Sequence, residues 1–324
     1  MKRTLPIILM LALAASCLAG CGGTQSTQNP AAPEEGATLS VVSTIFPGYD
    51  FAREIAGEHA TVKMLLPPGS ESHTFEPTPQ DIITIQNCDL FVYVGGVSDT
   101  WVEGILDSMD RTKMTILPMM ELVEIVEEEI KEGMQEEEHD GDDHDEEESE
   151  YDEHVWTSPV NAAHISRAIA DALAGLDEAN ADTYRANCED YVRRLGELDA
   201  AFREAADTAV RRTLIFGDRF PFRYFVDEYA LDYFAAFPGC STDTEASMRT
   251  VVFLIEKIRA EKIPVVFYIE FSNGKIADTI CEETGAKKLL FHSCHNLTAA
   301  DFDSGVTYID LMTRNLEHLK EAIC

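Results

Sequence analysis

Short apolar runs alternate with amphipathic stretches along the chain from residue 39 onward. The run at 88–95, Cys-Asp-Leu-Phe-Val-Tyr-Val-Gly, is almost continuously apolar, which is typical of a parallel strand covered on both faces. Further strands are expected at 39–46, 61–66 and 114–117, and helices at 49–57, 79–87 and 101–109. The pattern predicts a first α/β lobe over 39–158.

A single long helix is predicted after this lobe. The segment 178–206 contains no Pro and one Gly, and its apolar residues recur at alternating steps of four and three. These residues are Tyr184, Cys188, Tyr191, Leu195, Leu198, Phe202 and Ala205. At about 1.5 Å per residue the helix would be ~40 Å long, enough to cross two lobes. With a helix at 159–175 it makes up the predicted linking region, 159–207.

The alternation of strands and helices then repeats. Strands are expected at 212–216, 233–237, 263–270 and 287–291, and helices at 247–260 and 276–285. Pro264 lies near the start of its strand, where a missing N–H is tolerated. The predicted fold class is therefore α/β, with two lobes that are each a mostly parallel sheet flanked by helices, the second over 208–324.

The first twenty residues have the features of an export signal. A short basic start precedes an apolar run at 5–13, which is too short to span a bilayer. Leu18-Ala19-Gly20-Cys21 has the form of a bacterial lipobox, so cleavage would leave Cys21 as a lipidated N-terminus. The alternative is an ordinary signal peptide with an incidental cysteine. The segment 21–38 reads as a flexible tether, so we expect an extracytoplasmic protein anchored to the membrane by lipid.

The composition is that of a globular protein with a strongly acidic charge. Hydrophobic residues make up 45% of the chain, and a net charge of -34 excludes a nucleic-acid binder. Much of this charge is local, because residues 121–153 hold 19 Asp and Glu against one Lys. We expect 127–153 to be a disordered loop. It is either a solvated charge run without a role or an auxiliary metal loop that collects cations through His139 and His144.

Six of the eight cysteines are expected in the mature globular part. Cys17 would leave with the signal, and Cys21 would carry lipid. Six thiols in an exported protein permit up to three disulfides, whose connectivity the sequence does not decide. We favour Cys240 with Cys294, because both follow strands that should end at one cleft. Cys281 with Cys324 is the second expectation. There is no Cys-x-x-Cys pair, which argues against a thiolate zinc site.

Two histidines lie in similar loops. His73 lies in Ser-His-Thr-Phe-Glu-Pro and His154 in Glu-His-Val-Trp-Thr-Ser-Pro, so each is followed by an aromatic residue and then a proline. Imidazoles held on stiff, proline-limited loops suit a borderline metal such as zinc. His73, Glu270 and His292 all follow the carboxyl ends of predicted parallel strands, where open α/β sheets bind ligands.

These two loops resemble those of the zinc/manganese substrate-binding lipoproteins of ABC transporters. That family reads roughly Pro-His-x-(Tyr/Phe)-Glu-Pro-(Thr/Ser) and Asp-Pro-His-x-Trp-x-(Ser/Asp)-Pro, and the resemblance runs from about residue 39 to the C-terminus. It implies two α/β lobes joined by one long helix, with a metal site in the cleft between them and little closure. It also implies metal capture and delivery to an importer, which consists of a permease and its ATPase.

The resemblance places the family's last ligand at His292. At one other ligand position, this chain has a different residue from the family. The family commonly carries a third ligand in a pattern like His-x-Ala-Phe-x-Tyr. Phe222 and Tyr224 match this pattern, but the histidine position holds Arg219. An arginine stays protonated and cannot ligate a metal.

The ligand set implied by the resemblance is therefore His73, His154 and His292, with water or a carboxylate as the fourth ligand. Glu270 is the first carboxylate to consider, although an Arg219–Glu270 ion pair is the alternative we favour. Asp218, Glu71 and His295 are weaker candidates, and Arg219 and Asp218 are expected to surround the ligands. Imidazole-rich coordination favours Zn²⁺ over Mn²⁺.

Two other functions fit a metal-binding lipoprotein. Three histidines with an open position also describe a zinc-dependent hydrolase, but neither His-Glu-x-x-His nor Gly-x-Ser-x-Gly is present. A surface adhesin or sensor lipoprotein with a structural metal is the other alternative. We favour a zinc-binding protein without catalytic residues, acting as a monomer.

Overall fold

The computed structural model describes residues 38–71, 74–135, 151–241 and 245–324. Residues 38–324 form one compact unit. The signal peptide, Cys21 and most of the tether lie outside the described residues, as do His73, His139 and His144. Within the described part, no helix is both long enough and apolar enough to cross a membrane.

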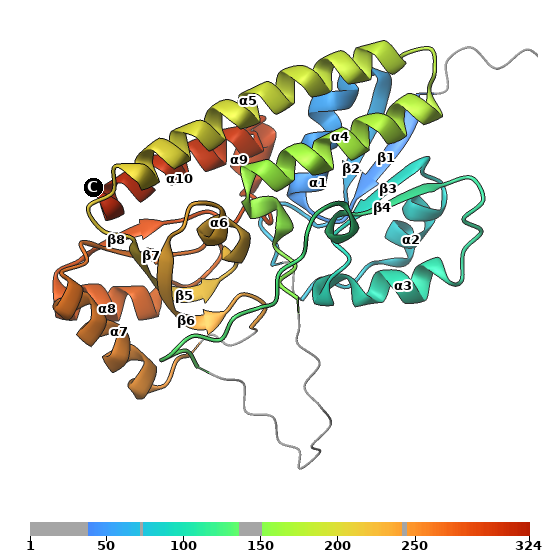
Figure 1. Ribbon diagram of the computed structural model, residues 1–324. Helices are drawn as coiled ribbons and strands as arrows, with labels where there is room; N and C mark the ends of the chain where they lie inside the picture. The colour runs from blue at the N-terminus through green and yellow to red at the C-terminus, as the bar shows by residue number, and fades with distance from the viewer. Residues whose placement is uncertain (1–37, 72–73, 136–150, 242–244) are drawn as a thin grey trace, which may run out of the picture. The chain divides into compact units, whose positions relative to one another are not determined.

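The first lobe is built around a parallel sheet with the strand order β2-β1-β3-β4. Val41 and Val92 face α1 and the helices behind it, whereas Val42 and Phe91 face α2 and α3, so the sheet is covered on both faces (Figure 1). The elements of this lobe are β1 (Leu39–Ser43), α1 (Phe46–Ala56), η1 (Gly57–His59), β2 (Ala60–Met64), α2 (Pro79–Gln86), β3 (Leu90–Tyr93), η2 (Val97–Asp99), α3 (Thr100–Leu106), β4 (Thr115–Pro118) and η3 (Met119–Leu122).

The second lobe repeats this plan with the parallel order β6-β5-β7-β8. Ile215 and Val266 pack against α7 and α8, and Phe216 and Phe267 pack on the opposite face. The elements of this lobe are β5 (Thr213–Phe220), α6 (Arg223–Glu228), β6 (Asp232–Pro238), α7 (Met248–Glu261), β7 (Val265–Tyr268), α8 (Lys275–Thr284), β8 (Lys287–Leu290), α9 (Ala299–Asp303) and α10 (Tyr308–Ile323). The predicted α/β class with two parallel sheets is confirmed. Residues 158 and 207 as lobe boundaries stay a prediction.

A 27-residue helix, α5 (Ala181–Asp207), runs along both lobes beside α4 (Pro159–Leu176) (Figure 1). The predicted stripe is confirmed, because all seven of its apolar residues are buried. The stripe belongs to one hydrophobic core that takes in side chains of both sheets. The lobes therefore share a core along this helix.

The last helix, α10, packs mainly against α5, and it also contacts α1 of the first lobe and β5 and β8 of the second. The Tyr308 N–H at its start donates to Asp50 Oδ2 on α1 over 2.9 Å. Arg53, one turn further along α1, donates to the carbonyl oxygens of Gly305 and Val306 over 3.3 and 3.2 Å. These hydrogen bonds tie the start of α10 to α1 of the first lobe.

The two histidine-containing loops lead into capped helices. Thr78 caps α2, its hydroxyl accepting from the Asp81 N–H over 3.2 Å and the Asp81 carboxylate accepting from the Thr78 N–H over 3.0 Å. Ser158 caps α4 with its hydroxyl, which accepts the Asn161 N–H over 3.3 Å, and Pro159 is the first helical residue. The loop ends are therefore fixed in place.

The ends of the acidic segment are ordered, so the prediction of disorder over all of 127–153 is wrong for residues 127–135 and 151–153. Glu127 pairs with Tyr151 in an antiparallel bridge. The Gln135 N–H donates to the Ala236 carbonyl of β6 over 2.9 Å, and Met134 is buried. Charge density does not reveal these contacts, and the bond from Gln135 to Ala236 joins segments far apart in the sequence. Residues 136–150 lie outside the described part.

Neither expected disulfide is formed among the described cysteines. Cys294 is fully buried, with its Sγ 3.7 Å from the His292 carbonyl oxygen, which directs the thiol into the loop rather than toward Cys240. Cys281 packs with the α7 and α8 cluster, while Cys324 is exposed at the end of α10 on the other side of the sheet. Sequence position alone did not show which way these side chains point.

Candidate metal centre

His154 lies between the lobes, just before the 3₁₀ turn η4 (Val155–Thr157), and is fully buried. Asp152 Oδ1 accepts the His154 backbone N–H over 2.8 Å and lies 3.0 Å from the ring Nδ1. Since a carboxylate accepts hydrogen bonds, this contact puts the ring proton on Nδ1 and the lone pair on Nε2. Tyr224 of α6 donates its hydroxyl to the Asp152 carbonyl over 2.7 Å. The second lobe thereby holds the segment that orients His154.

The surroundings of His154 are electronegative. Burial of the ring opposes a positive charge, but the charge and hydrogen bond of Asp152, with Glu153 and Glu128 nearby, outweigh it and raise the pKa of His154. Gly239 lies against the ring, where a Cβ would come within 3.2 Å of His154 Cε1 and 3.3 Å of Glu128 Oε1. The same negative charge would favour a metal cation at this place.

Glu153 is a buried carboxylate that the sequence analysis did not single out. Its Oε2 accepts the Ser98 N–H over 2.9 Å, and its Oε1 accepts the Ser98 hydroxyl. Gly96 permits this approach, because a Cβ there would lie 2.4 Å from Glu153. One sequence signal could have found this residue: it stands where the resembling loop pattern has proline.

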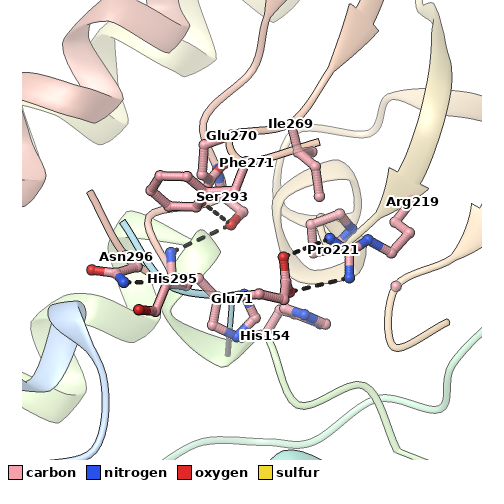
Figure 2. A pocket seen from close by; sticks show the side chains of 12 residues that line it. Glu71, His154, Arg219, Pro221, Ile269, Glu270, Phe271, Ser293, His295 and Asn296 are labelled. Atoms are coloured by element: carbon pink, nitrogen blue, oxygen red, sulfur yellow. Dashed lines mark hydrogen bonds and ion pairs between the residues drawn. The ribbon is translucent and has the colours of Figure 1, made fainter. Parts of the chain in front are cut away.

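His295 follows β8 and faces His154. The two rings are edge to face with centroids 4.9 Å apart, and the Trp156 ring lies 4.7 Å from that of His295 (Figure 2 shows His154 and His295). The His295 carbonyl accepts the Phe46 N–H of α1 over 3.1 Å. Ligand atoms of Glu153, His154 and His295 all lie within 4.8 Å of one another. This Glu153–His154–His295 triad is a buried set of donors that could hold a metal ion.

His292 takes a different position in the same loop. Its Nδ1 accepts the Cys294 N–H over 3.0 Å and lies 3.5 Å from Glu270 Oε1. Glu270 in turn accepts the Ser293 N–H over 2.8 Å. The loop turns at Cys294, whose φ of 63° is left-handed, so His295 and His292 point to different surroundings. The structure places His295 in the triad, and a ligand role for His292 or Glu270 stays a prediction.

Arg219 pairs with Glu71 and not with Glu270, so the favoured Arg219–Glu270 pair is wrong. Its guanidinium donates to both carboxylate oxygens of Glu71 over 3.2 and 3.1 Å, as Figure 2 shows, and to the Ser241 carbonyl over 3.4 Å. Asp218 is occupied by backbone groups, since it accepts the Arg219 N–H over 2.9 Å and the Ile269 N–H over 3.3 Å. Its expected place around the ligands stays a prediction.

The loop that leads to His73 is fixed to the second lobe. The Asn296 side-chain amide donates to the Pro67 and Ser70 carbonyls over 2.8 and 2.9 Å. The Gly69 N–H donates to the Leu297 carbonyl over 2.9 Å. His73 lies outside the described residues, two positions beyond Glu71. These contacts bring the start of its loop to the same pocket.

Comparison with known proteins decides the family. The family model of the zinc-uptake complex component A, periplasmic (ZnuA), matches residues 41–322. The chain belongs to this family. It is therefore a binding component of zinc uptake and not an enzyme, which removes the hydrolase alternative.

Similar proteins of known name agree with this assignment. The high-affinity zinc uptake system protein ZnuA of Bacillus subtilis is 34% identical over 94% of this chain and 93% of its own length. The zinc-binding lipoprotein AdcA of Streptococcus pneumoniae is 31% identical over 87% of this chain, which spans only 55% of that lipoprotein. The Zn(II)-bound ZnuA-like domain of pneumococcal AdcA is 29% identical, with a TM-score of 0.71 over 89% of this chain and 99% of that domain.

Proposed function

We propose that this protein captures zinc outside the cytoplasm and delivers it to the permease of an ABC importer, which its ATPase drives. The observation that carries the proposal is the buried triad, whose ligand atoms lie within 4.8 Å of one another between the lobes. Asp152 supports it, because metal-binding histidines commonly donate their second ring N–H to a carboxylate. The protein would act as a monomer with the lobes facing the permease.

We propose that zinc is held by Glu153, His154 and His295, with His73 as the fourth ligand. Three imidazoles and one carboxylate make up a four-coordinate site of the kind zinc prefers, whereas manganese favours more oxygen ligands. His292 would support the loop that presents His295. The zinc-bound relative domain is consistent with this cargo.

Metal analysis of the natively loaded protein tests the proposal. We expect about one tightly bound zinc per chain. Zinc at about a thousand times its dissociation constant should raise the free energy of unfolding by ~4 kcal/mol, because it binds the folded state alone. Elemental analysis and denaturation with and without zinc would measure both. A protein that is isolated with manganese, or that zinc does not stabilise, would contradict the proposal.

Membrane attachment through Cys21 is a second part of the proposed function. A lipidated N-terminal cysteine would keep the binding component beside its permease. We expect Cys21→Ala to be released into the medium or the soluble fraction, whereas the parent stays with the membrane. Cell fractionation with a lipid label measures this. A variant that is retained on the membrane with unchanged mobility would disprove anchoring through Cys21.

Residues 136–150, with His139 and His144, are proposed as an auxiliary metal loop. Deleting 136–150 should leave the tight site intact but lower the total zinc bound at excess metal, because the triad lies outside the deletion. The deletion spares Glu128, which accepts the Gly239 N–H over 2.7 Å, and Gln135. Calorimetric titration would measure both classes of site. Loss of the tight site would show that the segment is structural.

A further inference from the structure

The ion pair between Arg219 and Glu71 lines the same pocket as His154 and His295 of the triad (Figure 2). The Arg219 side chain is 12% exposed and that of Glu71 32%, and the guanidinium binds both oxygens of the carboxylate. Such fork-like pairs fix the geometry of both partners. Glu71 is therefore a carboxylate at the metal site that is directed toward a cation on the opposite lobe.

The pair limits the donors that a metal can find. Arg219 cannot ligate, because its guanidinium stays protonated, and it also occupies the carboxylate of Glu71. The cavity among these side chains measures about 10 Å³, which is room for roughly one water molecule. His154 and His295 of the triad line this cavity, so an ion that they bind would find little space there for additional oxygen ligands.

We propose that Arg219 is a specificity-determining residue, which favours a four-coordinate cation by keeping Glu71 and water away from the metal. Zinc is satisfied by four nitrogen and oxygen ligands, whereas manganese takes six, mostly oxygen. The guanidinium thus works by weakening the binding of manganese and not by strengthening the binding of zinc. This inference rests on the proposed function, since it assumes that the triad binds zinc.

The alternative is that the pair only fastens the loop at 67–71 to the second lobe. Two observations argue against this as its main role. Asn296 already holds Pro67 and Ser70, and Gly69 is bonded to Leu297, so the loop has other attachments to the second lobe. If the pair only held the loop, its loss would weaken the binding of every metal to the same degree. If Arg219 determines specificity, its loss changes the ratio of the affinities for manganese and zinc.

The affinities of Arg219→Ala, Glu71→Gln and the double variant for zinc and for manganese test the inference. We expect Arg219→Ala to bind manganese about tenfold more tightly than the parent, the lower end of what a residue around a metal contributes, with a smaller change for zinc. Adding Glu71→Gln should abolish the gain, because the released carboxylate is its source. Competition with a chelator and calorimetry would give the dissociation constants.

Arg193→Ala is the matched control, because Arg193 pairs with Asp190 and Glu197 on the exposed side of α5. It should leave the ratio of manganese to zinc affinity unchanged. If Arg219→Ala does not fold, Arg219→Met, which keeps an apolar stem, takes its place. An unchanged ratio, or equal weakening of both metals, overturns this inference alone. A parent that binds no zinc overturns the proposed function as well.

Discussion

Replacing His295 with alanine is expected to lower zinc affinity by about 100-fold or more, since even residues behind the ligands contribute ~10–100-fold. The ring supplies one member of the triad, and its centroid lies 4.9 Å from that of His154. The remaining donors would leave a position to water. Titration against a chelator of known affinity would measure the change, with circular dichroism to verify the fold.

His292→Asn is the matched control, because it separates two histidines of one loop. His292 Nδ1 accepts the Cys294 N–H over 3.0 Å, and an asparagine side-chain oxygen can take over that role. We therefore expect zinc affinity within a few-fold of the parent. Tight binding by His295→Ala together with a large loss in His292→Asn would return the ligand role to His292.

Trp156→Ala is expected to cost about 4 kcal/mol of unfolding free energy, the range for truncating a large buried aromatic residue. Trp156 is fully buried, its indole N–H donates to the Ser293 carbonyl over 2.8 Å, and its own carbonyl accepts the Tyr308 hydroxyl over 2.7 Å. The ring also lies against His154 and His295. Urea denaturation of the metal-free protein would measure the stability, and zinc affinity should fall in the same variant.

Trp156→Phe tests which part of the side chain matters. The phenyl ring keeps most of the packing but leaves the Ser293 carbonyl without its donor, so we expect a loss of about 1–2 kcal/mol. If Trp156→Ala unfolds at the same urea concentration as the parent, the core between the lobes does not depend on this ring.

The fold could be predicted from the sequence because its signals are local. Continuous apolar runs marked the parallel strands, and the steps of four and three from Tyr184 to Ala205 marked α5 and its buried face. The prediction for the acidic segment was wrong at its ends, because the contacts that order them are not local. Gln135 and Met134 are ordered by contacts with β6, which charge density cannot reveal.

The metal centre was predictable only in part. The loop pattern around His154 pointed to a ligand, and the structure places this residue in the triad. His295 was a weaker candidate than His292, because a count of positions does not show how a loop turns at Cys294. The Arg219–Glu71 pair joins residues 148 positions apart, and only the assembled lobes bring them together.

The contact between α10 and α1 has a consequence for the order in which the chain folds. Asp50 and Tyr308 are 258 positions apart, yet they share a buried hydrogen bond. In a chain made from the N-terminus onward, Asp50 emerges long before the Tyr308 N–H that it accepts. This contact between the first and last helices therefore forms only after the final segment has been made, because contacts between residues distant in sequence form late. A chain cut short before residue 308 would leave the buried Asp50 carboxylate without this backbone donor.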